Sequence, residues 1–364
     1  MSTGFSRVSA IGERDPRASE AAGRSARLIA AALGALLAAS VFTADAGVPT
    51  PPQTAPAATR TLARPSAATL TNVAYGDHPR QVLDFWQAPG TKPTPVVFHI
   101  HGGGWEAGNK GFVRGTAQLL AAGISVVSIN YRYTWQAQAE GVKPPVSAPL
   151  RDAARALQFV RSKAAEWNLD KKLIGATGSS AGACSSLWLA FHDDMADANS
   201  PDPIARESTR LFCAAVDTAQ TSLDPQQMKE WTPNSRYGAH AFGFAEASAT
   251  HARSQDAMFA DFLEHRNDVL VWIKEYSPIE HASSDDPPIY LIYPAPPSVG
   301  QPQSDPTHSA NFGVKLQERL RGLKVECELV YPGAPDVKHA DINGYLIGIL
   351  KGSRAENGRN PSRE

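Results

Sequence analysis

The chain has 364 residues, of which 42% are hydrophobic and 20% are charged. Its 35 basic and 36 acidic side chains leave a formal net charge of -1, and this balance argues against a nucleic-acid partner, since such proteins normally present a strongly basic face. Three cysteines (Cys184, Cys213 and Cys327) are too few for a disulfide scaffold and lack the paired spacing of a zinc site. We expect them to be small buried side chains, although export would permit one disulfide.

The first 46 residues have the form of a secretory signal. Arg24 and Arg27 precede an uncharged apolar run, 28–42, and a small-x-small cleavage site ends at Ala46. Because a membrane-spanning helix needs roughly 20 apolar residues, a permanent anchor is the weaker interpretation. The sequence therefore predicts a periplasmic or secreted protein, with an uncleaved anchor or a disordered tail as the alternatives.

Both ends of the remaining chain are expected to lie outside the folded domain. Residues 47–68 are rich in Pro, Ala and Thr and predict a flexible linker. Residues 352–364 show no apolar periodicity and predict a disordered tail. One folded domain is expected over 69–351.

Within this domain, short apolar and β-branched runs alternate with helical patterns. The expected strands cover 82–86, 95–100, 124–130, 173–178, 213–218, 289–294 and 325–332. The expected helices cover 111–122, 148–167, 181–191, 307–321 and 341–350. Several strands are apolar on both faces, as in parallel sheets covered on both sides. The alternation predicts an α/β fold with an open, mostly parallel sheet and helices on both faces, with ligands bound beyond the carboxyl ends of the strands.

One long segment, 219–283, interrupts the alternation with many aromatic residues and little strand pattern. A long insertion between two strands can form a lid over a site. Alternatively, its aromatic side chains pack into a small core of their own. Both interpretations stay open at this point.

The most informative motif is Gly178-Ser179-Ser180-Ala181-Gly182, between an expected strand and an expected helix. A serine on such a tight turn needs small neighbours, because its backbone is strained and its hydroxyl must project into the cleft. The amino end of the following helix also favours developing negative charge. We therefore predict Ser180 as a nucleophile, and Ser179 is disfavoured because only Ser180 is centred between the two glycines.

A second motif, His101-Gly102-Gly103-Gly104-Trp105, directly follows the expected strand 95–100. Consecutive glycines let backbone N–H groups face a substrate oxygen, which is how an oxyanion hole is built. Gly103, Gly104 and the amide of Ala181 are the predicted donors. A phosphate loop is disfavoured because no GK[ST] sequence is present, and His101 is interpreted as bracing the loop.

With these motifs, residues 70–350 resemble the α/β-hydrolase superfamily. Within it, the chain is similar to the HGGG-type esterases and lipases related to hormone-sensitive lipase and to the HGGGW carboxylesterases, including those of the BD-FAE type. The resemblance is carried by HGGGW at 101–105, NYRY at 130–133, GSSAG at 178–182 and the order of acid and histidine. It implies an α/β-hydrolase fold and a Ser-His-Asp triad.

A serine hydroxyl needs a base, and the base needs an orienting carboxylate. The family order places the acid after the penultimate strand and the histidine after the last, which favours His339 behind Tyr331-Pro332-Gly333 as the base. Asp305 is the predicted acid, with Asp336 as fallback and a plain helix cap as the alternative role of Asp305. The other histidines are disfavoured: His308 as part of a helix start, His281 as preceding its strand, and His192, His240, His251 and His265 as too early in the chain.

These residues together predict a serine esterase acting by two-step acyl transfer, without a metal or an organic cofactor. Its expected partner is a small-molecule or polysaccharide ester, and the resemblance to HGGGW esterases suggests feruloyl or acetyl esters. A peptidase or formamidase-like amidase on the same fold is the nearest alternative. A binding protein that has lost catalysis is the alternative of another class.

Overall fold

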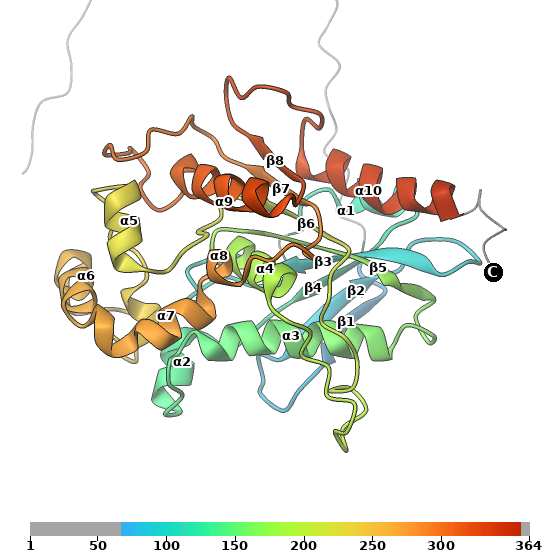
Figure 1. Cartoon of the computed structure of the whole chain (residues 1–364). Helices are drawn as coiled ribbons and strands as arrows, with labels where there is room; N and C mark the ends of the chain where they lie inside the picture. Colours follow the sequence, from blue (N-terminus) through green and yellow to red (C-terminus); the bar gives the residue numbers. More distant parts are fainter. Residues whose placement is uncertain (1–66, 112, 358–364) are drawn as a thin grey trace, which may run out of the picture. The chain divides into compact units, whose positions relative to one another are not determined.

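A twisted eight-stranded sheet lies at the centre of the computed structural model, which describes residues 67–111 and 113–357 (Figure 1). The strands are β1 (Leu70–Ala74), β2 (Val82–Trp86), β3 (Thr94–Ile100), β4 (Ser125–Ile129), β5 (Leu169–Ser179), β6 (Cys213–Asp217), β7 (Ile289–Ile292) and β8 (Cys327–Val330). Their order is β1-β2-β4-β3-β5-β6-β7-β8. The pairs β1–β2 and β2–β4 are antiparallel and all the others are parallel, so the predicted α/β-hydrolase fold is confirmed.

The burial of the strands explains both the successes and the one omission of the sequence prediction. Every residue of β4 is buried, and β3 is buried at all but one position, as expected for strands covered on both faces. β1 has no counterpart among the predicted strands. Four of its five residues are exposed, so it lacks the apolar signal that revealed the others.

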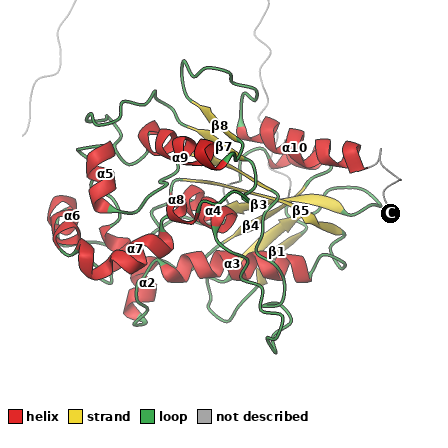
Figure 2. Cartoon of the chain, in the orientation of Figure 1, coloured by secondary structure: helices red, strands yellow, loops and turns green. Residues whose placement is uncertain are grey.

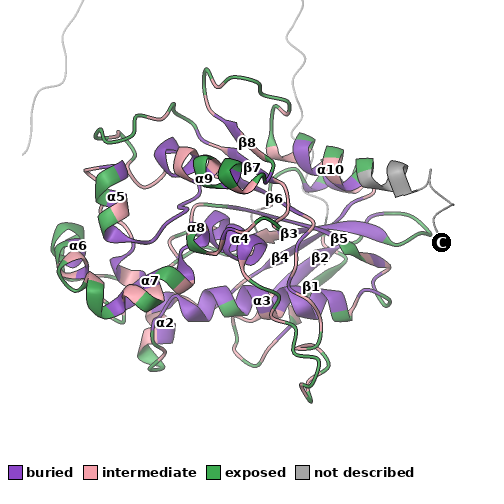
Figure 3. Ribbon diagram, in the orientation of Figure 1, coloured by how far each residue is buried: buried purple, intermediate pink, exposed green. Residues whose placement is uncertain are grey.

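Helices cover both faces of the sheet (Figure 2). One face packs against α3 (Ser147–Ser162), α4 (Ala181–Phe191) and α9 (Ala310–Leu323), and the other against α1 (Thr116–Ala121) and α10 (Ile342–Asn357). The short helix α2 (Thr134–Ala139) was not predicted. Every residue of α4 is buried, so the helix that follows Ser180 is held by packing along its whole length (Figure 3).

The insertion between β6 and β7 folds into short helices. They are α5 (Pro225–Trp231), η1 (Ala239–Phe242), α6 (Gln255–Glu264), η2 (Arg266–Val269), α7 (Leu270–Tyr276) and α8 (Pro278–His281). Its buried aromatic side chains are Trp231, Phe242, Phe259, Phe262 and Tyr276. These side chains belong to the main hydrophobic cluster, so most of the aromatic content serves packing. A lid movement stays a prediction.

The described residues begin close to the expected start of the domain and extend past its expected end. The predicted signal, 1–46, and nearly all of the predicted linker lie outside the described residues. α10 continues to Asn357, past residue 351 where the domain was expected to end, and 358–364 lie outside the description. None of the helices within 67–111 and 113–357 has the length and apolar character that a membrane span requires. All three cysteines are free, and Cys184 and Cys213 are buried as predicted.

Candidate active site

Ser180 occupies the sharp turn between β5 and α4, as predicted from its motif. Its backbone lies at φ 54° and ψ -123°, a strained conformation for a residue with a side chain. The Ser180 amide donates a hydrogen bond of 3.0 Å to the carbonyl of Asp217, at the end of β6. A Cβ atom at Gly182 would lie 2.1 Å from the carbonyl oxygen of Ile100. Only glycine therefore lets α4 approach β3 closely enough to project the Ser180 hydroxyl.

His308 is the histidine that meets Ser180. Its Nε2 atom lies 2.9 Å from Ser180 Oγ, and its Nδ1 atom lies 2.8 Å from Asp305 Oδ2. When Nδ1–H donates to the carboxylate, Nε2 presents its lone pair to the serine hydroxyl, as a general base must. Both residues belong to the loop between β7 and α9. The structure thus places Asp305 beside a histidine, as expected of the predicted acid, but this histidine is His308 and not His339.

The structure does not bring His339, the predicted base, to Ser180. His339 Nδ1 lies 2.7 Å from Glu328 Oε2, and its amide donates to Glu328 Oε1 at 2.7 Å. Its ring packs edge-on against Tyr345 of α10. The carboxylate of Glu328, on β8, thereby holds the ring against α10 and away from the serine.

A recognisable signal for His308 was present in the sequence. Asp305 and His308 are three residues apart, close enough for one turn of chain to join acid and base. The sequence predicts a helix over 307–321 with His308 at its start, but α9 begins only at Ala310 with Ser309 as its N-cap. His308 therefore lies in the loop before the helix, where its ring reaches Ser180.

Two other candidates also lie outside this arrangement. Asp336 is exposed, at φ 54°, and it is not among the residues that line the cavity beside Ser180. The hydroxyl of Ser179 lies 3.4 Å from that of Thr218. The ring nitrogens of His308 instead meet Asp305 and Ser180.

The loop after β3 brings Gly103 and Gly104 to the cavity beside Ser180. Gly103 has φ 101°, and a Cβ atom there would lie 2.4 Å from the carbonyl oxygen of Ala107. The loop can take this path only with glycine. Ala181, the third predicted donor, is the first residue of α4 and directly follows the serine.

Tyr131 holds the same loop in place through its contacts with His101. Its hydroxyl donates a 2.7 Å hydrogen bond to the carbonyl of His101, and the two rings stack with centroids 4.2 Å apart. Burial lowers the pKa of His101 to about 4, so its imidazole is neutral near pH 7. These contacts agree with the interpretation of His101 as a bracing residue.

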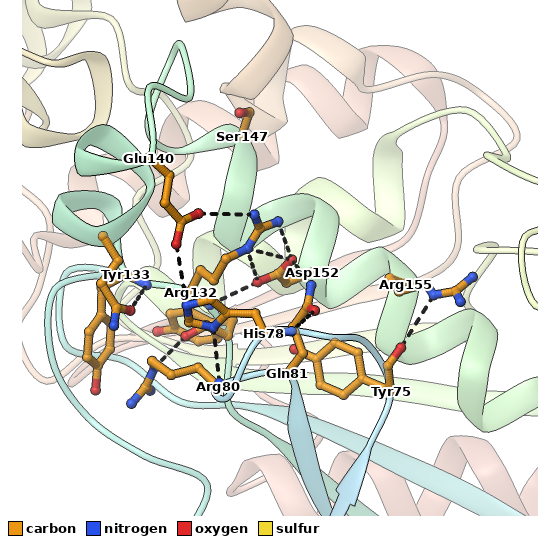
Figure 4. Close-up of polar contacts among 12 residues, drawn as sticks. Tyr75, His78, Arg80, Gln81, Arg132, Tyr133, Glu140, Ser147, Asp152 and Arg155 are labelled. Carbon is orange, nitrogen blue, oxygen red and sulfur yellow. Dashed lines mark hydrogen bonds and ion pairs between the residues drawn. The ribbon is translucent and has the colours of Figure 1, made fainter.

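An ion pair between Arg132 and the buried Asp152 fixes the segment that carries Tyr131 (Figure 4). Arg132 donates from Nη2 to Asp152 Oδ1 at 2.7 Å and from Nε to Oδ2 at 3.0 Å, while its amide also donates to Oδ2 at 2.9 Å. Asp152 is 1% exposed and also accepts a hydrogen bond of 2.7 Å from Gln81. Arg80 donates to the Tyr131 carbonyl at 2.6 Å. The NYRY motif thus supports the glycine loop through the contacts of Tyr131 with His101.

The loop with Asp305 and His308 is anchored to the insertion by Asn311, which is fully buried. Its Nδ2 group donates to the carbonyls of Trp231 at 2.8 Å and Ser298 at 3.1 Å, and its Oδ1 accepts from the Ser298 amide at 2.7 Å. The position of His308 therefore depends on contacts with α5.

The serine opens into a cavity of about 1140 Å³. Its lining combines apolar side chains such as Tyr237 and Ile342 with exposed polar ones such as Asn109 and Arg114. Asp217 also lines it, and burial raises the pKa of its carboxyl, opposed by the positive charge of Arg114. The cavity has room for a substrate with both apolar and hydroxyl-rich parts.

Comparison with known proteins identifies the family of the chain. A family model described as BD-FAE matches residues 83–309, more than half of the chain. The chain belongs to the BD-FAE family. The matched range includes both glycine motifs and the Asp305–His308 turn.

Curated relatives of this BD-FAE protein include two proteins of Mycobacterium tuberculosis. The probable carboxylic ester hydrolase LipM is 28% identical over 61% of this chain and 46% of its own length, and the esterase LipQ is 28% identical over 62% and 48%. The chain thus matches about half the length of these relatives. Among solved structures, a truncated carbohydrate esterase from gut microbiota superimposes with a TM-score of 0.55 at 19% identity, covering 81% of this chain and 97% of that one. This last likeness shows the fold.

Proposed function

We propose that this protein is a serine hydrolase that cleaves carboxylic esters, with Ser180 as nucleophile, His308 as base and Asp305 as the orienting acid. The observation that carries the proposal is the His308 ring, which bridges Ser180 Oγ and Asp305 Oδ2 at 2.9 and 2.8 Å. The names of LipM and LipQ support the reaction class.

In the proposed mechanism, His308 Nε2 takes the proton of Ser180 Oγ while the oxygen attacks the ester carbonyl. The amides of Gly103, Gly104 and Ala181 stabilise the oxyanion. His308 then gives its proton to the leaving alcohol and a serine acyl ester remains. A water molecule, deprotonated by the same ring, releases the acid and restores the serine.

Labelling with a fluorophosphonate tests the nucleophile directly, since the probe reacts with an activated serine. The wild type should be labelled covalently, and Ser180→Ala should lose the label while Ser179→Ala keeps it. Wild-type protein that is folded and unlabelled would instead identify the chain as a binding protein of hydrolase fold.

For the substrate, we propose short-acyl esters of polar alcohols, including carbohydrate esters. The exposed side chains of Asn109, Arg114 and Gln255 at the cavity offer hydrogen bonds to hydroxyl groups. Rates on p-nitrophenyl esters of two to twelve carbons, methyl ferulate, acetylated xylan and matched amides test this choice. A preference for long chains would identify a lipase, and cleavage of amides alone would identify an amidase.

We also propose that the protein is exported, on the basis of the sequence pattern in residues 1–46. Cell fractionation with amino-terminal sequencing of the product tests this. Cleavage near Ala46 is the expected result, and an intact amino terminus on a cytosolic product would contradict it.

A further inference from the structure

Two histidines and a glutamate gather at the end of α4 that lies farthest from Ser180. His192 is the residue after α4, Glu275 lies on α7 and His281 ends α8. One ligand atom of each lies within 4.8 Å of those of the other two. The group therefore joins the helix of the nucleophile to the insertion, and none of the contacts of the active site involves it.

Hydrogen bonds fix the tautomer of His192. Its Nδ1 atom lies 2.9 Å from the carbonyl oxygen of Asp193, which can only accept, so Nδ1 carries the proton. In the neutral imidazole, Nε2 then has a lone pair. This Nε2 atom lies 3.4 Å from Glu275 Oε1, so in the neutral form of the ring a lone pair faces a carboxylate oxygen, and a second ring proton or a cation is needed to join the two.

His281 is oriented in the same way. Its Nε2 atom lies 2.6 Å from the backbone carbonyl of Glu275, which leaves the lone pair on the other ring nitrogen. The same carbonyl accepts a 2.8 Å hydrogen bond from the indole of Trp188. The two imidazole rings lie next to one another, with centroids 4.8 Å apart. Metal-binding histidines typically donate their second ring nitrogen to a backbone carbonyl in this manner.

A cation between the acceptors would satisfy all three groups. Two neutral imidazoles and one carboxylate are a ligand set typical of Zn²⁺, in which a water molecule completes the tetrahedron. The three residues are partly exposed, with 19% of the His192 side chain and 37% of that of Glu275 accessible, so an ion and its water can enter from solvent.

We propose that His192, Glu275 and His281 form a binding site for one Zn²⁺ ion that clamps the insertion helices α7 and α8 to the end of α4. Small movements of the side chains would bring the ligands to zinc–nitrogen distances of about 2.0–2.1 Å. Because the three ligands come from separate elements of the fold, bound metal should stabilise the folded state.

The test uses untagged full-length protein that has been treated with a chelator and dialysed. Zinc is titrated in competition with a chromophoric chelator, and melting temperatures are measured with and without zinc. We expect one zinc equivalent to bind to the wild type and to raise its melting temperature. Glu275→Gln and the double variant His192→Gln/His281→Gln should each bind zinc at least about tenfold more weakly, since even outer partners of a metal contribute 10- to 100-fold.

His265→Gln is the matched control, because His265 is exposed at the end of α6, where its Nδ1 atom lies 3.0 Å from Asp261 Oδ1. It should bind zinc like the wild type. Zinc affinity that is equal in the wild type and in the folded Glu275→Gln variant would overturn the proposal. Equal losses in His265→Gln and Glu275→Gln would also overturn it, as they would indicate adventitious surface binding.

Discussion

Two histidine–carboxylate pairs follow neighbouring strands of the sheet, and only one of them reaches the serine. Nδ1 of His308 lies 2.8 Å from Asp305, and Nδ1 of His339 lies 2.7 Å from Glu328. The pairs are thus alike in the bond that orients the ring. They differ at Nε2, which meets Ser180 Oγ in the first pair and lies near Gly348 of α10 in the second. An imidazole oriented by a carboxylate at Nδ1 becomes a candidate base only when its Nε2 atom meets the serine hydroxyl.

The surroundings of the two carboxylates differ as well. The Asp305 side chain is 58% exposed, whereas that of Glu328 is 9% exposed and also accepts hydrogen bonds from the amides of Lys338 and His339. Burial acts to raise the pKa of Glu328, but the His339 ring and the two amides outweigh it and lower the pKa below its ordinary value. We therefore expect Asp305 to affect turnover and Glu328 to affect stability.

The largest expected effect separates the two histidines. His308→Ala should lower kcat for p-nitrophenyl acetate by at least about 10⁴-fold, because Ser180 loses its base. His339→Ala should leave kcat close to the wild-type value, because its ring is held by Glu328 and Tyr345 and not by the serine. Initial rates of the two purified variants measure this, and an exchange of the two results would restore His339 as the base.

Substitutions of the two carboxylates, Asp305 and Glu328, should also differ in their effect on kcat, but less strongly than those of the histidines. Asp305→Asn should lower kcat by about 10²- to 10⁴-fold, because the ring of His308 loses the acceptor that fixes its tautomer. Glu328→Gln should leave kcat unchanged. If both variants kept full activity, Asp305 would be a helix-cap residue and no part of the triad.

The next prediction concerns two glycines with positive φ, Gly103 in the loop beside Ser180 and Gly333 in the loop before His339. Gly103→Ala should lower kcat by about 10²- to 10³-fold, because the added Cβ meets the Ala107 carbonyl and displaces an oxyanion donor. Gly333→Ala is the control in the loop before His339, where φ is 85° and a Cβ atom would meet no atom within 4 Å. It carries similar backbone strain and should retain activity. Equal losses would attribute the effect to strain alone.

The smallest effect concerns stability and its dependence on pH. Glu328→Gln should lower the free energy of unfolding at pH 7 by about 1.5–3 kcal/mol, the range for hydrogen bonds to a charged group. Because the pKa of Glu328 is lower in the folded state, its stabilisation is present above its unfolded pKa of about 4.3 and is lost as the pH falls through the folded value. Urea unfolding between pH 3 and pH 7 should show the wild type and the variant converging at the acidic end. A difference independent of pH would contradict this origin.

Much of the fold was predictable because its signals are local. Strands buried on both faces announce themselves as apolar runs, and the turn at Ser180 requires the small residues that its motif contains. β1 escaped because it lies at the sheet edge with mostly exposed residues. The helices of the insertion escaped because they are short and are stabilised by contacts with the main cluster.

The choice of histidine could not be made from strand order alone. His308 and His339 both follow a late strand and both have a carboxylate nearby in the fold. The partner of His339 is Glu328, eleven residues before it on β8, and the two meet only because the loop after β8 folds back on the strand. By contrast, Asp305 and His308 are joined by their own turn, a short-range feature that the sequence does contain.

Asp305 and His308 lie in the same turn of the chain, so we expect them to move together. A shift of the loop that holds them would carry Asp305 and His308 together, preserving their mutual bond while opening the gap to Ser180. The anchor of that loop is Asn311, whose amide reaches Trp231 at the end of α5. A rearrangement of the insertion that moves Asn311 would therefore change the distance between His308 Nε2 and Ser180 Oγ while the bond between His308 and Asp305 is kept.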